Sequence, residues 1–217
     1  LSFMEAIEVL AGEAGMTVPA RNLGSQQQAD ARTELSDVIE KAVRFFRMML
    51  KSREGSQTIS YLETRGLSLA TQDAFGLGYA PSDRKALFIA LTEQGVTPEQ
   101  LIDSGMCIKP GDGGQLYDRF RNRVMFPIRD ARGRCIAFGG RALDASAKAK
   151  YLNSPETILF DKGRSLYNHG PARSALGKKH PLIVVEGYMD VIALAQAGFL
   201  TAVAPVGTAI TENQLML

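Results

Sequence analysis

The sequence has little of what marks secreted, membrane-bound or disulfide-stabilised proteins. It contains two cysteines among 217 residues and no Cys-x-x-Cys pair, which excludes a disulfide scaffold and suits a reducing compartment. No run approaches the ~18 consecutive apolar residues that a membrane span needs. The first residues carry no basic stretch of the kind that opens a signal peptide. We therefore expect a cytoplasmic protein without a membrane segment.

The composition is that of an average globular protein, with 45% hydrophobic residues, 22% charged residues and a net charge of +2. The length allows one full domain, or one domain and part of another, around a real core. Because the chain starts with Leu1 and ends at Leu217 inside an apparent element, we expect a piece of a longer protein.

Few residues are available for a zinc site. The candidates are Cys107, Cys135, His169 and His180. None of the usual short ligand spacings separates them, so a zinc site within this chain is not expected. Cys135 alternates within a strand pattern and is interpreted as a small core residue.

The first half of the sequence predicts a series of helices. Apolar residues share one face over residues 3–14, whereas the polar stretch 20–30 predicts a linker. Helical spacing is strongest over residues 30–51. Shorter helices are predicted at Thr58–Thr64, after a Ser68 cap, and after the capping box that begins at Thr97.

The middle of the sequence changes to strands. Arg123–Asp130 and Arg134–Phe138 predict a hairpin with its turn at residues 130–133. Pro127 indicates an edge or a bulge in the first strand. The pair Gly139-Gly140 predicts the end of the second strand.

The last part of the sequence predicts a βαβ unit. Leu182–Val185 is a continuous apolar run, typical of a strand buried on both faces. A helix is predicted at 188–197 and a second buried strand at Thr201–Val206, followed by a helix that Thr211 can cap. The whole chain is therefore expected to mix helices and strands before an α/β unit.

Glu186 is the sharpest candidate for chemistry. It stands at the carboxyl end of the apolar strand, where ligands bind in open α/β sheets, and Asp190 follows one helical turn later. A carboxylate at such an edge can bind Mg²⁺, which prefers hard oxygen ligands. Glu186 can equally begin a helix and complement its dipole, and one carboxylate alone makes a poor metal site.

Positive charge is concentrated between Arg119 and Lys150, a segment with nine basic and two acidic residues. This excess of seven charges leaves the rest of the chain at −5. Arg119, Arg121 and Arg123 alternate, so a strand would direct all three to one face. Because guanidinium groups bind phosphates bidentately, we prefer a phosphate-binding surface to an ordinary solvated face. The pattern does not separate DNA, RNA and nucleotides.

Two glycine-rich stretches are further candidates for phosphate binding. Residues 111–114 lack the Lys-Ser/Thr pair and the strand–helix context of a phosphate loop, so they predict a hairpin or loop tip. Gly139 and Gly140 would let a ligand come close and place Arg141 beside it.

Four motifs resemble, in this order, the core of bacterial DnaG-type DNA primases and extend over nearly the whole chain. They are Tyr117–Ile128, Phe138–Arg141, Lys150–Thr157 followed by Phe160–Arg164, and Val184–Val191. The resemblance implies an α+β fold: an amino-terminal mixed helix/strand basic subdomain, then the start of an α/β Toprim fold. The implied division is the tail of an absent zinc-binding domain at 1–19, a linker at 20–30, the basic subdomain at 31–179 and a partial Toprim subdomain at 180–217.

The resemblance also implies roles for individual residues. Glu186 matches the catalytic and metal-binding carboxylate, and Asp190 matches a residue that supports the fold or the metal. Positions linked to template and nucleotide handling match Arg65, Arg121, Arg123, Arg141, Lys150 and Lys162. The implied cofactor is Mg²⁺ or Mn²⁺, with Zn²⁺ only in an upstream domain. The family's Asp-x-Asp pair is missing after Glu186, so most ligands of the two-metal site are absent.

Two hypotheses follow for function. The first is part of an enzyme that makes short RNA primers from ribonucleoside triphosphates on a single-stranded DNA template at the replication fork. Its replicative helicase would bind a carboxy-terminal domain missing here, and residues 1–217 alone are expected to be inactive. The second is a non-catalytic module that binds single-stranded DNA or nucleotides. A Toprim topoisomerase or nuclease ranks lower, because it would not carry the motifs at 119–127 and 150–157.

Overall fold

The computed structural model describes residues 3–15, 23–111, 113–177, 181–207 and 209–217. The chain divides into two compact units, Leu1–Thr33 and Glu34–Leu217. The first unit contains α1 (Phe3–Glu13) and the beginning of α2 (Leu23–Lys51). α1 confirms the helix predicted there, and Gly15 follows it with a φ of 66°, the left-handed conformation that suits glycine.

The linker predicted at 20–30 is wrong over residues 23–30, which form the first turns of α2. Residues 20–22 lie outside the described residues. This stretch has no apolar stripe, but glutamine and alanine are good helix formers. The side-chain amide of Gln26 also donates to Asp30 Oδ1 at 3.0 Å, one turn further along the helix. Intrinsic propensity therefore extends the helix where hydrophobic periodicity gives no signal.

The second unit contains the remaining helices and strands. Its helices beyond α2 are α3 (Ser56–Thr64), α4 (Leu69–Ala74), α5 (Ala86–Thr92), α6 (Pro98–Asp103), α7 (His169–Ala175), α8 (Tyr188–Gln196) and α9 (Glu212–Leu215), with short 3-10 helices η1 (Arg53–Gly55) and η2 (Lys162–Arg164). Its strands are β1 (Gly78–Ala80), β2 (Cys107–Ile108), β3 (Tyr117–Asp118), β4 (Arg123–Arg129), β5 (Cys135–Ala142), β6 (Tyr151–Asn153), β7 (Leu166–Tyr167), β8 (Ile183–Val184) and β9 (Ala202–Pro205).

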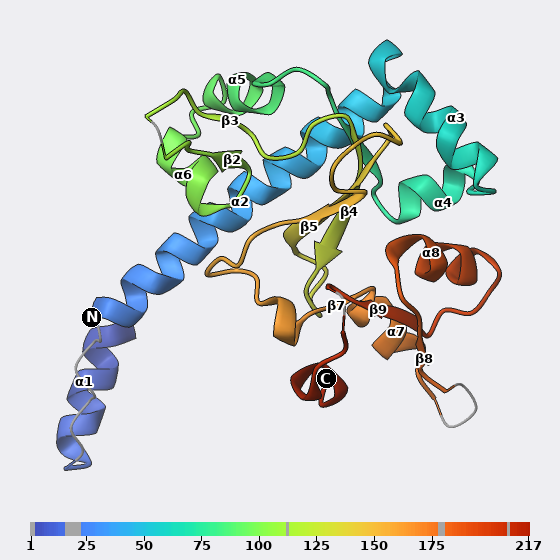
Figure 1. The fold of residues 1–217 in the computed structure, drawn as a ribbon. Helices are drawn as coiled ribbons and strands as arrows, with labels where there is room; N and C mark the ends of the chain where they lie inside the picture. Colours follow the sequence, from blue (N-terminus) through green and yellow to red (C-terminus); the bar gives the residue numbers. More distant parts are fainter. Residues whose placement is uncertain (1–2, 16–22, 112, 178–180, 208) are drawn as a thin grey trace. The chain divides into compact units, whose positions relative to one another are not determined.

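These strands form a central sheet of order β1-β4-β5-β6, a small β2-β3 hairpin and a sheet of order β7-β9-β8 (Figure 1). The central pairings are antiparallel, and the β4–β5 hairpin turns at residues 130–133 as predicted. The Gly133 amide donates to the Asp130 carbonyl at 2.9 Å, and Gly133 has a φ of 81°. The prediction of a loop tip at 111–114 is also confirmed, because this stretch joins β2 to β3; residue 112 lies outside the described residues.

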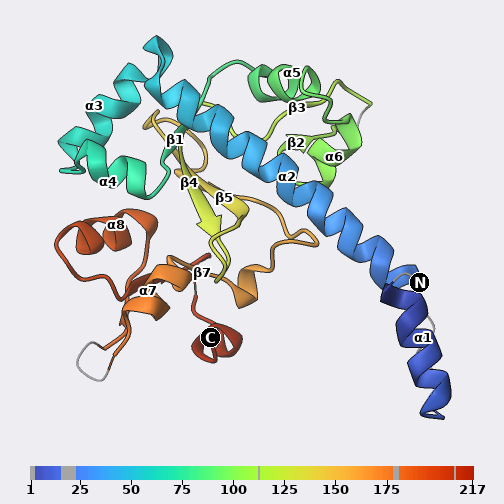
Figure 2. The same cartoon turned by 180° about the vertical axis from the view of Figure 1, so that it is seen from behind.

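The central sheet is buried on both faces. The part of α2 after Glu34 crosses one face in both views (Figure 2), where its Phe46 meets Phe138 at a ring-centroid distance of 5.3 Å. Val124, Phe126 and Ile128 of β4 belong instead to a second cluster with residues of α3, α8 and β9. β4 and β5 therefore connect α2 to the segment that carries Glu186.

The predicted edge at Pro127 is confirmed. β1 pairs with β4 only from Arg123 to Met125, so Pro127 has a described strand neighbour on one side, at Phe138. The register shift comes later, between Ile128 and Arg129. Proline lacks an N–H to donate, which explains why it is tolerated where the second neighbour is missing.

The glycine pair does not end β5, so that prediction is wrong. β5 continues to Ala142, and aromatic rings lie directly against both glycines. A Cβ on Gly139 would lie 2.5 Å from Cζ of Tyr188, and one on Gly140 would lie 2.9 Å from Cδ1 of Phe120. The glycines therefore make room for rings on the strand.

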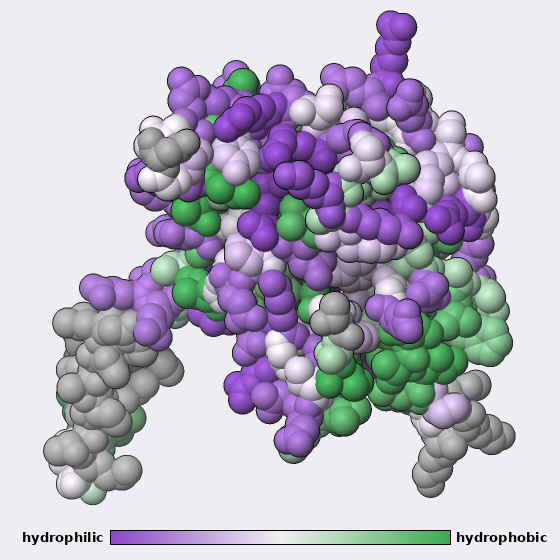
Figure 3. All heavy atoms as spheres, in the orientation of Figure 1, coloured by the Kyte–Doolittle hydropathy of each residue, from purple (hydrophilic) through white to green (hydrophobic). Residues whose placement is uncertain are grey.

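The predicted βαβ unit is confirmed, since β8 and β9 pair in parallel and α8 lies between them in the sequence. β9 is buried as predicted, but the expectation that 182–185 is buried on both faces is wrong. Leu182 and Val184 are each 46% exposed, because β8 has β9 as its described neighbour on one side. Figure 3 shows apolar atoms gathered over β8 and the turn after α8.

Three predicted helix caps are confirmed. Thr97 and Thr211 each form a capping box, with Gln100 and Gln214 as the reciprocal partners. The Ser68 hydroxyl accepts from the Thr71 amide at 3.2 Å. Among the described helices, none combines the length and the apolar character needed to cross a membrane.

Candidate functional site

Glu186 and Asp190 line one cleft of about 340 Å³. Glu186 follows β8 directly, and Gly187 caps α8 in an extended conformation, so Asp190 enters the first turn of the helix. Both carboxylates are exposed. The remaining lining residues are Tyr151, Asn153, Tyr188, Pro205 and Gly207. The cleft therefore lies at the carboxyl ends of β8 and β9, where open α/β sheets bind ligands.

The donor set of the cleft fits a hard divalent cation. Two carboxylates and the side-chain amide of Asn153 supply oxygen atoms, and Mg²⁺ typically uses one or two carboxylates, retained waters and substrate phosphates. No group of three or more His, Cys, Asp or Glu residues comes together within the described residues. Protein side chains here can therefore supply part of a magnesium shell.

Neither cysteine faces this cleft. Cys135 is fully buried on β5, which confirms its prediction as a core residue, and Cys107 lies beside Asp118 at 3.7 Å. Burial raises the pKa of both thiols to about 12. His180 lies outside the described residues.

Tyr188 fixes the start of α8 beside the carboxylates. Its ring stacks on Phe126 at a centroid distance of 5.2 Å and meets Tyr167 edge-on at 4.8 Å. Its hydroxyl donates to Asn153 Oδ1 at 2.7 Å. Burial raises the pKa of Tyr188 far above its usual range, so the hydroxyl stays protonated. The residue anchors the cleft wall and is not a candidate acid or base at neutral pH.

Asn153 is held from the other side by Arg119. The Arg119 Nε and Nη2 atoms donate to the Asn153 carbonyl at 3.2 and 3.0 Å. Burial lowers the pKa of the Arg119 guanidinium, as it disfavours the charged form. Arg119 therefore acts as a structural support of the cleft.

The structure brings Arg65 and Arg141 together on one tyrosine ring. The Cζ atom of Arg141 lies 4.4 Å from the Tyr61 ring centroid, and that of Arg65 lies 5.5 Å from it. Arg65 follows α3 and Arg141 lies near the end of β5, so two segments far apart in the sequence meet here. Two of the six basic residues that the resemblance implied therefore share one aromatic neighbour.

Tyr151 connects this cationic pair to the carboxylate cleft. It begins β6, pairs with Arg141 in register and is 42% exposed. Burial raises the pKa of its hydroxyl; the charge of Arg141 opposes that shift and the charge of Asp190 adds to it. Arg141 and Asp190 therefore both lie within electrostatic reach of the Tyr151 hydroxyl.

The two candidate lysines lie in different places. Lys150 is exposed and directly precedes Tyr151, with its carbonyl accepting from the Ala142 amide at 2.8 Å. Lys162 begins η2, and its carbonyl accepts from Gln214 Nε2 at 2.8 Å. Lys162 is not among the residues that line the cleft. Lys150 does not line the cleft either, but it adjoins the lining residue Tyr151 in the sequence, which Lys162 does not.

The predicted alternation of Arg119, Arg121 and Arg123 on a single strand is wrong. β3 ends at Asp118 and β4 begins at Arg123, and Asn122 between them has a φ of 48°. Arg121 donates to the Asp118 carbonyl and lies over the Tyr117 ring at 5.0 Å. Arg123 donates to the Ala149 carbonyl at 2.9 Å. A turn therefore separates the three side chains.

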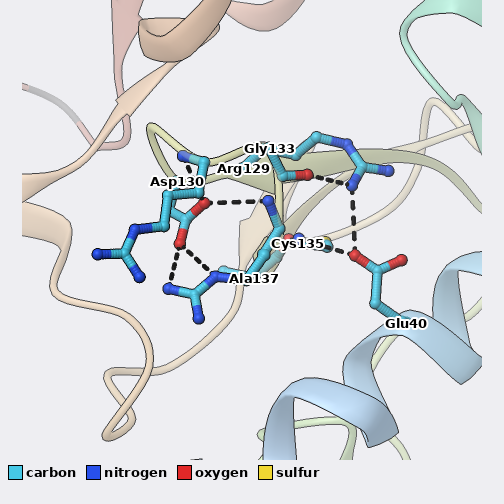
Figure 4. Close-up of polar contacts among 8 residues, drawn as sticks. Glu40, Arg129, Asp130, Gly133, Cys135 and Ala137 are labelled. Carbon is cyan, nitrogen blue, oxygen red and sulfur yellow. Dashed lines mark hydrogen bonds and ion pairs between the residues drawn. The ribbon is translucent and has the colours of Figure 1, made fainter. Parts of the chain in front are cut away.

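Much of the positive charge of the 119–150 segment is used inside the molecule. Arg129 donates to Glu40 Oε1 on α2 at 3.3 Å, and the same oxygen accepts from the Cys135 amide at 2.9 Å (Figure 4). Arg134 donates to Asp130 Oδ2 at 2.7 Å across the hairpin turn. The basic residues that bind the chain's own oxygen atoms include Arg119, Arg121, Arg123, Arg129 and Arg134, and one nitrogen of Arg141 donates to the Ala142 carbonyl at 3.1 Å. Net charge alone therefore overstated the phosphate-binding surface.

Some important residues gave little signal in the sequence. Tyr188 hydrogen-bonds to Asn153 at the cleft, and Tyr61 contacts Arg141. These partners are far apart in the sequence, so the contacts are evident only in the folded chain. Tyr61 lies in α3 and Arg65 caps its end four residues later, the spacing of side-chain neighbours on a helix. That spacing could have identified the aromatic partner of Arg65.

Comparisons with known proteins show to which family this chain belongs. The family model described as "DNA primase catalytic core, N-terminal domain" matches residues 45–173, and a Toprim domain model matches residues 180–217. A DNA primase of Pseudomonas putida is 46% identical over 218 residues, covering 99% of this chain and 33% of that protein. A solved DnaG primase catalytic domain bound to ssDNA is 43% identical, with a TM-score of 0.77, covering 87% of this chain and 60% of that one.

A further solved structure is the RNA polymerase domain of Mycobacterium tuberculosis primase DnaG with a double-stranded DNA oligomer that has a 6-nucleotide overhang. It is 35% identical with a TM-score of 0.79, covering 85% of this chain and 57% of that one. Together, the two matched regions define a protein in which a Toprim domain begins after a primase-type N-terminal domain. The chain belongs to the family of bacterial DnaG-type DNA primase catalytic cores. It spans about a third of the length of the curated relatives that it matches.

Proposed function

We propose that this chain is the template- and nucleotide-binding part of a DNA primase that synthesises short RNA primers on single-stranded DNA. In this proposal residues 31–179 form the basic subdomain, and residues 180–217 begin the Toprim subdomain that carries Glu186. The support comes from family membership and from one observation. Glu186, Asp190 and Tyr151 line the same cleft, and Arg141 lies within electrostatic reach of the Tyr151 hydroxyl.

The chain's own residues would divide the work by charge. Arg65, Arg141 and Lys150 would bind phosphate groups of the template or of the incoming ribonucleoside triphosphate, since guanidinium and ammonium groups match phosphate oxygens. Glu186 and Asp190 would hold a divalent cation, Mg²⁺ or Mn²⁺, in the cleft that they line. When bound, such an ion neutralises phosphate charge and lowers the pKa of an attacking hydroxyl.

Support for a DNA template partner comes from the related catalytic domains solved with ssDNA and with a double-stranded oligomer. We propose single-stranded DNA as the partner of this chain as well, with Arg121 and Lys162 as further contacts along the strand. The replicative helicase and Zn²⁺ belong, in this proposal, to other parts of a complete primase, which would work in the cytoplasm at the replication fork.

Residues 1–217 are expected to bind DNA without extending primers. Two carboxylates at the cleft give an incomplete two-metal site for phosphoryl transfer. The non-catalytic binding module therefore describes the isolated chain, and the enzyme describes a complete primase that contains it.

Fluorescence anisotropy with a labelled oligothymidylate tests the binding part. Reversing both charges in Arg141→Glu/Lys150→Glu should weaken binding at least about 10-fold and lower the salt slope by ~0.7 for each phosphate that is no longer neutralised. Arg44→Glu is the matched control, because Arg44 is an exposed cation on α2 outside the residues that line the cleft. Unchanged affinity in the double variant would refute the assignment.

Glu186→Gln separates binding from catalysis. This variant should bind the oligonucleotide with nearly wild-type affinity, because the carboxylate would serve the cation and not the DNA phosphates. In a complete primase that carries this sequence, it should abolish most Mg²⁺-dependent ribonucleotide incorporation. Equal losses of binding from Glu186→Gln and from the Arg141 and Lys150 reversals would point instead to a single metal-coupled nucleotide site.

A further inference from the structure

Tyr61 contacts two guanidinium groups with one ring. Arg141 lies over it at 4.4 Å and Arg65 at 5.5 Å, and Arg65 is its neighbour one turn further along. Cation–π contacts of this length are attractive. The same ring is therefore a shared neighbour of two like charges, one from the residue that follows α3 and one from β5.

The hydroxyl of Tyr61 does not explain its presence here. It is a buried oxygen without a hydrogen-bond partner among the described residues. A buried polar atom left without a partner is unfavourable, and a solvent-inaccessible oxygen cannot meet a ligand. The aromatic ring, which packs against the core cluster containing Leu62 and Tyr188, is therefore the useful part of the side chain.

The ring connects the cationic pair to the rigid part of the molecule. Tyr61 packs with the core cluster, whereas Arg141 leaves β5 opposite Tyr151, a lining residue of the carboxylate cleft. Long arginine side chains lose rotamer freedom when they bind a ligand. A ring fixed by the core reduces that loss, and its negative face offsets the repulsion between the two cations.

We propose that Tyr61 is a positioning residue that holds Arg65 and Arg141 together as one phosphate-binding pair beside the Glu186 cleft. The proposal rests on the proposed function, because it assigns those two arginines to phosphate. The ligand chemistry is a phosphate group, and its source is the DNA backbone or a ribonucleoside triphosphate. Tyr61 itself touches neither.

Variants of Tyr61 in residues 1–217 test the proposal, with a labelled oligothymidylate and a fluorescent ATP analogue as separate probes. Tyr61→Leu removes the ring and should weaken binding about 5- to 10-fold, as expected when two cation–π interactions are removed. Tyr61→Phe keeps the ring and should restore affinity to within about 2-fold of wild type. The probe that responds identifies the source of the phosphate.

A double-mutant cycle shows whether Tyr61 acts through the arginines. In an Arg65→Gln/Arg141→Gln background, Tyr61→Leu should have no further effect on affinity, because the groups that it positions are gone. Tyr79→Leu removes another tyrosine ring from the same core cluster and serves as the matched control, with wild-type affinity expected. Circular dichroism at the assay temperature checks that each variant is folded, and Tyr61→Met replaces Tyr61→Leu if the latter is not.

The outcomes separate this inference from the proposed function. Wild-type affinity in Tyr61→Leu, or in Tyr61→Met where it replaces that variant, would overturn the role of Tyr61 alone if Arg65→Gln/Arg141→Gln weakens binding. A further loss from Tyr61→Leu in the arginine-deficient background would overturn it as well, since the effect would then not pass through the arginines. Wild-type affinity in Arg65→Gln/Arg141→Gln would contradict the proposed function itself.

Discussion

Replacing Gly139 with alanine tests how the central sheet holds the cleft. Gly139 lies in β5 directly under the ring of Tyr188, and the hydroxyl of that ring donates to Asn153. An alanine Cβ would lie 2.5 Å from Tyr188 Cζ and 2.7 Å from its hydroxyl oxygen, well inside van der Waals contact. The ring must therefore move, and α8, which begins at Tyr188, must move with it.

The cost has two parts. Overpacking a well-packed core typically costs about 1–3 kcal/mol, and losing the Tyr188–Asn153 hydrogen bond adds about 1 kcal/mol. The sum of about 2–4 kcal/mol corresponds to a decrease in melting temperature of roughly 5–15 °C for a chain of this size. In a Tyr188→Leu background, which removes the ring, the added cost of Gly139→Ala should drop below about 1 kcal/mol.

Thermal unfolding followed by circular dichroism measures both effects. Gly111→Ala is the matched control, because no atom lies within 4 Å of a Cβ placed there. Its melting temperature should stay within about 1 °C of wild type, as for most surface substitutions. A Gly139→Ala variant that melts with the wild type, or an equal cost with and without the Tyr188 ring, would refute this account of the glycine.

Two further predictions concern Asp118, which is buried, and Glu40, which is half-buried. Burial raises the pKa of Asp118 to about 6, so the stabilisation by its protonated form is complete below the unfolded pKa near 4 and is lost as pH rises through 6. Between pH 4 and 7, the free energy of unfolding of the wild type should therefore fall by about 1–3 kcal/mol relative to that of Asp118→Asn. Parallel curves of unfolding free energy against pH for the two proteins would contradict this. Glu40→Ala removes the oxygen that accepts from both the Cys135 amide and Arg129. Urea titrations should show a free energy of unfolding lower by about 1–2 kcal/mol, with a smaller loss in Glu40→Gln. A Glu40→Ala variant as stable as the wild type would show that these hydrogen bonds between α2 and the β4–β5 hairpin do not stabilise the fold.

Local signals in the sequence predicted local structure well. The capping residues Ser68, Thr97 and Thr211, the turn at residues 130–133 and the βαβ order depend on contacts within a few residues, and the structure confirms them. The start of α2 was missed because helix propensity without an apolar stripe leaves no periodic signal.

Features set by distant contacts were not predictable. A glycine in a strand pattern fits a strand end or a close approach equally well, and only the position of the Tyr188 ring decides the case of Gly139. The charge count treated Arg119 and Arg123 as available, because their acceptors, the carbonyls of Asn153 and Ala149, come near only in the fold. Glu186 and Arg141 were candidates from their sequence context, the roles proposed for them and for Arg65 rest on the resemblance, and Tyr61 came from the structure.

The central claim is that different residues bind phosphate and support catalysis: Arg65, Arg141 and Lys150 bind phosphate, and Glu186 holds the cation. Its most direct test measures oligonucleotide affinity and Mg²⁺-dependent primer synthesis side by side for Glu186→Gln in a complete primase carrying this sequence. We predict nearly unchanged affinity and a rate lower by about 100-fold or more, as expected when several kcal/mol of charge stabilisation are removed. Primer synthesis at the wild-type rate in Glu186→Gln would contradict the account.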